Sequence, residues 1–130
     1  MAQTDRPLSP HLGIYRWQVQ MVSSILHRAT GIALAAGTLL VAAGLLTLAA
    51  GPAPFAGFVA FCASPLGLML LLGWTWALSY HLLNGVRHLL QDAGLGYAAA
   101  AFVRNSWLTV IGSLLLTILV WAWALPGGGA

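Results

Sequence analysis

The sequence predicts an all-α membrane protein with three transmembrane helices, and three observations support this fold class. Of the 130 residues, 60% are hydrophobic and only 5% are charged, whereas soluble domains carry about 25% charged residues. Three segments are apolar over most of the roughly 20 residues that a helix needs to cross a bilayer. The five basic residues, all arginine, lie before or early in the first segment or beside the connection between the second and third. Lipid rather than water must therefore solvate most of this chain.

The first 20 residues differ from the rest of the chain. They are polar in comparison and contain Pro7 and Pro10. Both prolines disfavour helix at the residue before them, so residues 1–20 are predicted to form an extended or turning arm on the cytoplasmic side. The arm has neither the cleavage pattern of a signal peptide nor the amphipathic pattern of a transit peptide. It is interpreted as part of the mature protein, and residues 21–130 as a single transmembrane domain.

The first predicted helix covers about residues 21–50. It begins with a polar turn or two and continues as about 19 apolar residues, close to the length of one membrane span. Gly51 and the prolines beside it end the helix. The apolar segment 55–64 is short and lies between prolines, so a loop with an interfacial turn is expected there.

The second predicted helix covers about residues 65–91, with Pro65 in its first turn, where the missing N–H does no harm. At ~1.5 Å per residue it is roughly 40 Å long, so its end should project beyond a hydrocarbon core of ~30 Å. Glycines and small residues within 94–101 predict a turn. The third helix is predicted over about 104–125, and tryptophans near both of its ends suit the two membrane interfaces.

The arginine distribution predicts the orientation of the chain. Arginines flank only the start of the first helix and the connection between the second and third. By the positive-inside rule these segments face the cytoplasm, or the matrix in a mitochondrion, and the C-terminus faces the opposite side. Polar residues from two helix ends then meet on the cytoplasmic side: Ser24, His27, Arg28, His81, Arg87, His88 and Asp92.

Four residues of the second helix share one face. His81, Asn84, Gly85 and His88 have the spacing i, i+3, i+4 and i+7. Ionisable groups at the end of an apolar run are costly and indicate a function. Because neutral imidazole is a good iron ligand, one hypothesis is a haem-ligating face with His81 deepest in the membrane. The other is a helix end whose histidines and arginine reach the lipid headgroups. Spacing alone leaves both open.

Two residues of the first helix suggest a second binding function. Ser24 and Arg28 lie one helical turn apart, where a hydroxyl and a guanidinium could hydrogen-bond a quinone carbonyl. Alternatively, this is an ordinary helix start, in which Ser24 bonds the backbone and Arg28 extends toward the headgroups. The single cysteine, Cys62, excludes an intrachain disulfide and a thiolate metal site. The scattered arginines form no nucleic-acid-binding cluster.

Two blocks of residues, in this order, carry a resemblance to a known family. The first is Ser24-Ile25-Leu26-His27-Arg28-Ala29-Thr30-Gly31, and the second is His81 with Gly85-Val86-Arg87-His88-Leu89 and Asp92. Arg6-Pro7-Leu8-Ser9-Pro10-His11-Leu12 in the arm adds to them. Together they resemble the cytochrome b556 membrane-anchor subunits of succinate dehydrogenase (succinate:quinone oxidoreductase, respiratory complex II). The resemblance covers nearly the whole chain, including the three spans.

The resemblance implies one of two membrane anchors in a four-subunit complex of electron transport and the tricarboxylic acid cycle. In that family a flavoprotein oxidises succinate and an iron–sulfur subunit passes electrons to ubiquinone, so no catalytic residue and no separate activity are expected here. His81 would be an axial ligand of the iron of haem b, with the second ligand from the partner anchor. Ser24 and Arg28 would bind ubiquinone. The residues that would bind the haem propionates are His27, Arg28, Arg87 and His88.

The resemblance also implies a location. The arm is most similar to that of the bacterial members related to mitochondria, so a multi-pass protein of the bacterial inner membrane is expected, in preference to the mitochondrial inner membrane. Two rival functions remain. One is a haem-free, quinone-reactive anchor of a fumarate reductase-like complex, against which His81 argues. The other is a small transporter or structural subunit, although a transport pathway needs polar groups at several depths.

Overall fold

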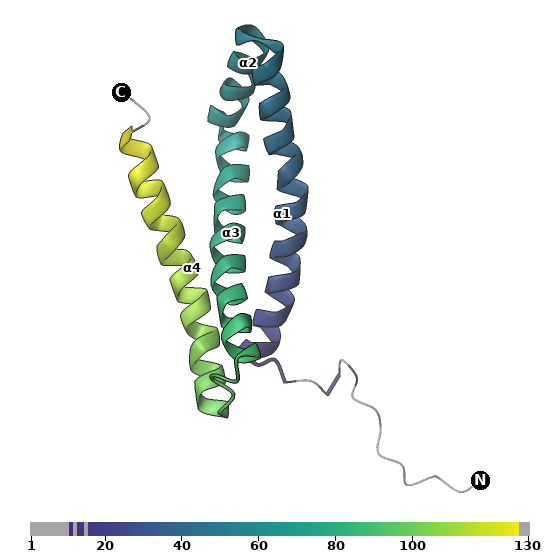
Figure 1. The fold of residues 1–130 in the computed structure, drawn as a ribbon, viewed down its shortest axis with the longest axis vertical. Coiled ribbons are helices and arrows are strands. Elements are labelled where there is room, and N and C mark those ends of the chain that lie inside the picture. The colour runs from purple at the N-terminus through teal and green to yellow at the C-terminus, as the bar shows by residue number, and fades with distance from the viewer. Residues whose placement is uncertain (1–10, 12, 15, 128–130) are drawn as a thin grey trace, which may run out of the picture.

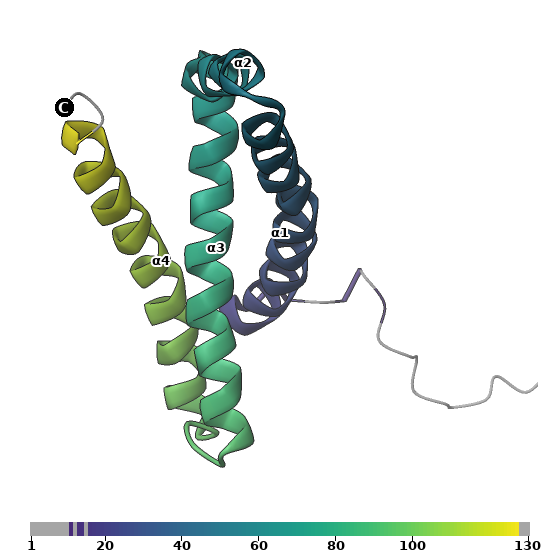
Figure 2. The same cartoon turned by 45° about the horizontal axis from the view of Figure 1, so that its top comes forward.

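The computed structural model describes residues 11, 13–14 and 16–127. It contains the helices α1 (Val19–Ala50), α2 (Pro52–Ala63), α3 (Pro65–Asp92) and α4 (Ala99–Gly127), with no strand in this part of the chain. α3 lies between α1 and α4, and the short α2 joins α1 to α3 at one end (Figure 1, Figure 2). Much of the arm predicted for residues 1–20, including Pro7 and Pro10, lies outside the described residues.

Three of these helices are long and apolar enough to cross a membrane. They cover Val19–Ala50 with 32 residues, Pro65–Asp92 with 28 residues and Ala99–Leu125 with 27 residues. The predicted all-α fold with three membrane spans is therefore confirmed. α1 and α4 run in one direction and α3 in the other, so the start of α1, the end of α3 and the start of α4 lie at the same end of the bundle (Figure 1).

The segment 55–64, predicted as a loop with an interfacial turn, belongs almost entirely to the helix α2. Pro52 and Pro54 occupy the first turn of α2, where a proline needs no helical N–H partner. α2 packs closely on the start of α3, because a Cβ added to Gly67 would lie 2.2 Å from the backbone oxygen of Phe61. The prediction was wrong because prolines at the edge of an apolar segment can begin a helix as well as exclude one.

α4 begins earlier than predicted. Residues 98–101 were assigned to a turn because they are small, but α4 already begins at Ala99. Gly94 and Gly96 have φ angles of 83° and 80°, in the left-handed region that glycine adopts without steric strain. These two glycines reverse the chain within a few residues, so the alanines that follow are free to form the first turn of α4.

A row of buried hydroxyl residues joins α4 to α3. Its members are Ser106, Thr109, Ser113 and Thr117, and none is more than 6% exposed. Each hydroxyl donates to a backbone carbonyl of its own helix over 2.7 to 3.0 Å, so the row leaves no hydroxyl unpaired against α3. Small side chains of this kind let two membrane helices approach closely.

The interior of the described chain is polar and its outer surface is apolar. Ala77 and Tyr80 are the buried hydrophobic residues, whereas ten buried residues are polar or charged. Large aliphatic side chains of all three long helices point outward instead, as expected of a surface that meets lipid tails. The contacts between α1 and α3, and between α3 and α4, therefore concentrate the polar groups that can form a site.

Candidate functional site

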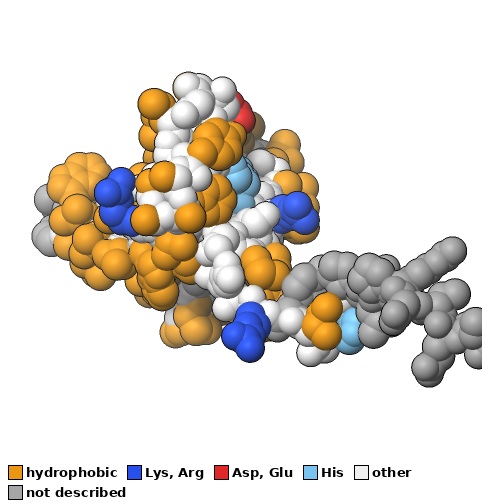
Figure 3. Space-filling model, turned by 90° about the horizontal axis from the view of Figure 1, so that it is seen from below, with side chains coloured by type: hydrophobic (Ala, Val, Ile, Leu, Met, Phe, Trp, Pro, Cys, Tyr) orange, Lys and Arg blue, Asp and Glu red, His pale blue; other side chains and the backbone are white. Residues whose placement is uncertain are grey.

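The residues singled out from the sequence gather at the end of the bundle where α1 begins and α3 ends. Figure 3 looks onto this end and shows arginine and histidine side chains among hydrophobic ones. The described arginines, Arg16, Arg28, Arg87 and Arg104, all belong to segments at this end. The predicted convergence of two helix ends on one polar zone is confirmed, while the side of the membrane that this zone faces stays a prediction.

The centre of the zone is a pair of stacked imidazoles. The rings of His27 on α1 and His81 on α3 have centroids 3.9 Å apart and planes 11° apart. Nδ1 of His81 lies 3.1 Å from the backbone oxygen of His27 and 3.3 Å from Oγ1 of Thr30. Because a carbonyl oxygen only accepts, Nδ1 of His81 carries the proton, and the lone pair of the neutral ring is on Nε2.

Gly31 makes room for this stack. A Cβ added to Gly31 would lie 3.1 Å from Cε1 of His81, which is tighter than ordinary van der Waals contact. Thr30, one residue before, is 3% exposed and donates its hydroxyl hydrogen to the helix carbonyls of Leu26 and His27. A small residue and a satisfied hydroxyl on α1 thus form the surface against which the His81 ring rests.

A third histidine completes the cluster. The ring of His88 is tilted by 55° against that of His27, with centroids 5.1 Å apart. A Cβ on Gly85 would lie 4.0 Å from Cε1 of His27, so Gly85 also faces α1. The shared face predicted for α3 is confirmed, because His81, Gly85 and His88 all meet the same turn of α1.

A buried polar network lies beside the histidines, and three of its members, Ser23, Tyr80 and Asn84, were not among the predicted site residues. Oγ of Ser23 donates to Oδ1 of Asn84 over 3.0 Å. The hydroxyl of Tyr80 lies 3.1 Å from both the backbone oxygen and Oγ of Ser23. All three residues have no exposed surface. The position of Asn84 on the histidine face was the signal available in the sequence, whereas its pairing with Ser23 depends on how the two helices meet.

Arg87 is a further member of this network and connects it to α4. Its NH1 donates to Oδ1 of Asn84 over 3.1 Å, and its guanidinium carbon lies 4.4 Å above the ring centroid of Phe102 on α4. The side chain is only 6% exposed, and its Nε and NH2 have no hydrogen-bond partner among the described residues. The Arg87 guanidinium therefore extends from the Asn84 network to the contact between α3 and α4.

Ser24 and Arg28 are the predicted quinone ligands, and they differ in how far their side chains are exposed. The side chain of Arg28 is exposed and that of Ser24 is half-buried. They keep the spacing of one turn on α1, which puts them on a common stripe of the helix. A hydroxyl and a guanidinium on this stripe remain accessible to a group outside the chain.

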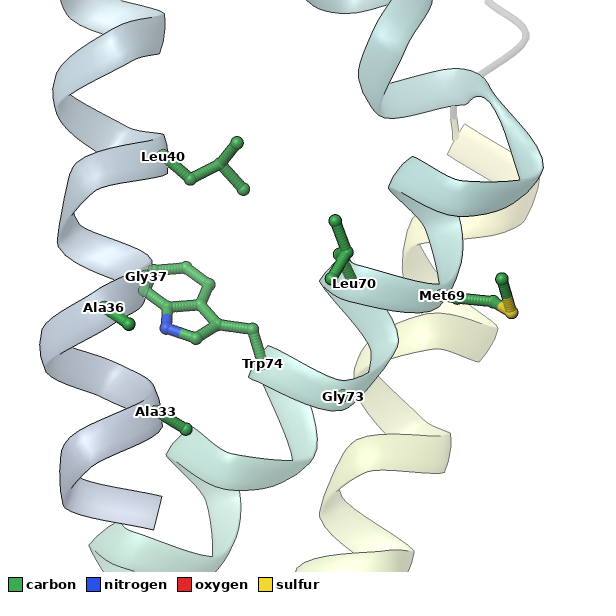
Figure 4. Close-up of a pocket in the computed structure, with 8 residues that line it drawn as sticks. All are labelled: Ala33, Ala36, Gly37, Leu40, Met69, Leu70, Gly73 and Trp74. Carbon is green, nitrogen blue, oxygen red and sulfur yellow. The ribbon is translucent and has the colours of Figure 1, made fainter. Parts of the chain in front are cut away.

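An apolar groove lies on the mid-membrane side of the cluster. It has a volume of about 460 Å³ and is lined by Ala33, Ala36, Gly37, Leu40, Met69, Leu70, Gly73 and Trp74. Figure 4 shows the Trp74 indole reaching from α3 across to Gly37 on α1. A Cβ on Gly37 would lie 1.9 Å from Nε1 of Trp74, so only glycine accommodates the indole. Trp74 is two turns before His81, on the same stripe of α3.

The donor set limits which metal centres could form here. Within the residues that the structure describes, no group of three or more histidine, cysteine, aspartate or glutamate side chains could hold a metal ion. The stacked pair instead presents the Nε2 of a single oriented imidazole.

The fold and this site define a class: a three-span membrane protein that gathers imidazole, amide and guanidinium groups at one end of its bundle. The family model of the succinate dehydrogenase/fumarate reductase transmembrane subunit matches residues 2–121. The chain belongs to that family.

Individual relatives agree with this assignment. The chain is 42% identical to the succinate dehydrogenase cytochrome b556 subunit of Paracoccus denitrificans over 115 residues, which are 88% of each protein. It is 39% identical to the cytochrome b556 subunit of Rickettsia felis over 89% of this chain and 90% of the relative. The mitochondrial cytochrome b560 subunit of Mus musculus is 39% identical over 89% of this chain and 68% of the relative. The resemblance drawn from the two motif blocks is confirmed.

Proposed function

We propose that the chain is a membrane-anchor subunit of succinate dehydrogenase that ligates haem b together with a partner anchor. In this proposal it also helps to form the ubiquinone-reduction site and docks the iron–sulfur and flavoprotein subunits. The names of the relatives support the complex and the cytochrome. The observation that supports the haem most directly is the His81 ring, whose Nδ1 is engaged by the backbone oxygen of His27.

The residues present fit a haem. Metal-ligating histidines commonly donate their second ring N–H to a carbonyl oxygen, which sets the tautomer and orients the ring. His81 makes this bond to His27, so its Nε2 is the atom available to the iron. When bound, the haem supplies a one-electron redox centre. The partner anchor supplies the second axial ligand in this proposal.

The cationic and polar groups around the stack suit the anionic edge of the macrocycle. Arg28 is exposed beside the pair, and Nδ1 of His27 is buried without a hydrogen-bond partner among the described residues. His27 and Arg28 are therefore the first candidates to hold the propionates. His88 contacts His27, whereas Arg87 extends toward α4, so these two are weaker candidates.

Ser24 and Arg28 are the proposed ubiquinone ligands. The N–H groups of a guanidinium and the O–H of serine can donate to a quinone carbonyl oxygen, and they stabilise negative charge that develops on it during reduction. The accessibility of Arg28 supports this role. The alternative, an arginine that only extends toward headgroups, predicts no specific effect on ubiquinone.

The proposed setting is the bacterial inner membrane, with the arginine-rich end on the cytoplasmic side. The arginines that the structure describes all belong to that end, and this distribution together with bacterial relatives supports the choice over the mitochondrial inner membrane. Exposed aliphatic side chains on α1, α3 and α4 give surfaces for lipid and for the partner anchor. Succinate chemistry belongs to the flavoprotein subunit in this proposal, and this chain alone has no activity.

A haem-free anchor and a transporter subunit are the rival functions. A polar pathway through the membrane is not supported, because the buried hydroxyls of α4 are bonded to their own helix. A haem-free anchor does not require a histidine whose Nδ1 is held by a backbone oxygen, as that of His81 is.

The deciding experiment is a reduced-minus-oxidised optical spectrum of the purified complex, native and with His81→Ala. His11→Ala is the matched control, because His11 is exposed and outside the cluster. We expect a b-type band in the native and control complexes and its loss in His81→Ala, while succinate oxidation with an artificial acceptor persists. An unchanged band in His81→Ala would place the ligand elsewhere, and no band in the native complex would favour the haem-free anchor.

A further inference from the structure

Asn84 is the residue that connects the buried polar network to the histidine cluster. It has no exposed surface, and its side chain engages three other side chains. Oδ1 accepts from Oγ of Ser23 over 3.0 Å and from NH1 of Arg87 over 3.1 Å, and Nδ2 lies 3.2 Å from Nε2 of His88. Because arginine can only donate, the amide orientation is determined: oxygen toward Ser23 and Arg87, nitrogen toward His88.

The first connection runs through the α1 backbone. Ser23 precedes His27 by one helical turn, so its carbonyl is the helical acceptor for the His27 N–H. Asn84 holds the Ser23 hydroxyl, and Tyr80 holds both the hydroxyl and the carbonyl oxygen of Ser23. These bonds join α3 to the very turn of α1 that carries His27.

The second connection runs through a side chain. The amide nitrogen of Asn84 donates to Nε2 of His88, which requires a neutral His88 ring with its proton on Nδ1. That ring packs against His27 at a centroid distance of 5.1 Å. Asn84 therefore acts on His27 both through the helix turn beneath it and through the ring beside it.

We propose that Asn84 is a positioning residue that sets the register of α1 against α3 and thereby the orientation of the His81 imidazole. His27 transmits the effect, because its ring stacks on His81 and its backbone oxygen accepts the His81 Nδ1–H. The part of this inference that concerns iron ligation rests on the proposed function; the part that concerns helix register does not.

Two variants and one control test the inference in the intact, purified complex. Asn84→Ala removes the bonds of Asn84 to Ser23 and to His88. Ser23→Ala removes the Ser23 hydroxyl with a minimal change of volume and keeps the bond between Asn84 and His88. The Tyr80 bond to the Ser23 carbonyl stays in both variants. Ser79→Ala is the control, because Ser79 is a buried α3 hydroxyl, 4% exposed, that bonds only the Thr75 carbonyl of its own helix. If Asn84→Ala prevents assembly, Ser23→Ala alone decides the test.

Hydrogen exchange followed by mass spectrometry measures the register. Loss of the Ser23 hydroxyl, which bonds both Asn84 and Tyr80, should raise amide exchange in the segment 19–30 at least about fivefold in Ser23→Ala, and a similar rise is expected in Asn84→Ala. Exchange farther along α1, at 38–50, should stay unchanged, and Ser79→Ala should match the native complex throughout. Equal exchange in all four proteins would overturn the proposal.

The electron paramagnetic resonance spectrum of the oxidised haem and its midpoint potential measure the His81 orientation. We expect both to shift in Ser23→Ala and Asn84→Ala at near-native haem content. A double variant that combines Ser23→Ala with Asn84→Ala, added for this measurement, should shift no further than Asn84→Ala. Native haem signals alongside raised exchange would overturn the positioning role. If the native complex contains no b-type haem, the proposed function fails, and the exchange comparison still decides whether Asn84 sets the register.

Discussion

The imidazole of His27 lies flat on that of His81, and the backbone oxygen of His27 also accepts the hydrogen bond from Nδ1 of His81. One residue of α1 thus contacts the His81 ring by its side chain and by its main chain. This double contact leaves the ring little freedom to rotate. A preoriented imidazole loses less conformational entropy on ligation than a free one does, which is consistent with the proposed haem site.

The surface beneath the ring gives a first prediction. Gly31→Leu should displace the His81 imidazole, because even a Cβ at position 31 lies 3.1 Å from Cε1. We expect severe loss of haem per assembled complex, and a smaller loss for Gly31→Ala, where the ring yields by a few tenths of an ångström. Haem-to-protein ratio measures both. Gly57→Ala, with open space around its Cβ, is the control. Full haem content in Gly31→Leu would contradict the stacked geometry.

The contact between Gly37 and Trp74 gives a second prediction. Gly37→Ala places a Cβ 1.9 Å from the rigid indole, so α1 and α3 must separate, and overpacking of this kind costs about 1–3 kcal/mol. We expect a lower midpoint of thermal unfolding for the complex. Gly73→Ala lines the same groove but meets nothing within 4 Å, so it should be neutral.

A double variant at the same two positions tests whether the indole causes the loss of stability. Gly37→Ala combined with Trp74→Leu removes the clash and should recover part of the lost stability. A double variant no more stable than Gly37→Ala would show that the indole is not the cause.

The accessibility of Arg28 gives a third prediction. Arg28→Ala should lower ubiquinone reduction by about tenfold or more, the size expected from losing a charge-assisted hydrogen bond, while assembly and succinate oxidation with an artificial acceptor persist. Arg104→Ala, at another exposed arginine of the same end, should leave ubiquinone reduction near the native rate. If Arg28→Ala lowered the amount of complex as much as the rate, the arginine would have a structural role instead.

The exposed surface of the helices gives a fourth prediction. Of the 32 residues of α1, only Ser23, Thr30 and Gly44 are buried, so the bundle leaves much of α1 without a protein neighbour. We expect the chain expressed alone to carry no stoichiometric haem, and co-expression with the partner anchor to restore it. Haem content of the detergent-purified chain measures this. Full haem incorporation by the single chain would show that three helices suffice.

Some expectations failed because one residue pattern is compatible with two local structures. The segment 55–64 was expected as a loop because prolines bound it, yet Pro52 and Pro54 begin α2. Proline is compatible with both a loop and a first helical turn. The choice depended on packing, since α2 comes within contact distance of α3 at Gly67. The early start of α4 has the same origin, because small residues fit either a turn or a helix.

The sequence by itself determined the number of spans, the end of the bundle that carries the arginines, and the face shared by His81, Gly85 and His88. These features depend on hydropathy and on the 3.6-residue period within single helices, which are local properties. The tertiary structure alone decided that Ser23 meets Asn84, 61 positions away in the chain, and that the His27 oxygen meets His81, 54 positions away. Such pairings follow from the register between two helices. That register also brings the Trp74 indole onto Gly37, and no single helix encodes it.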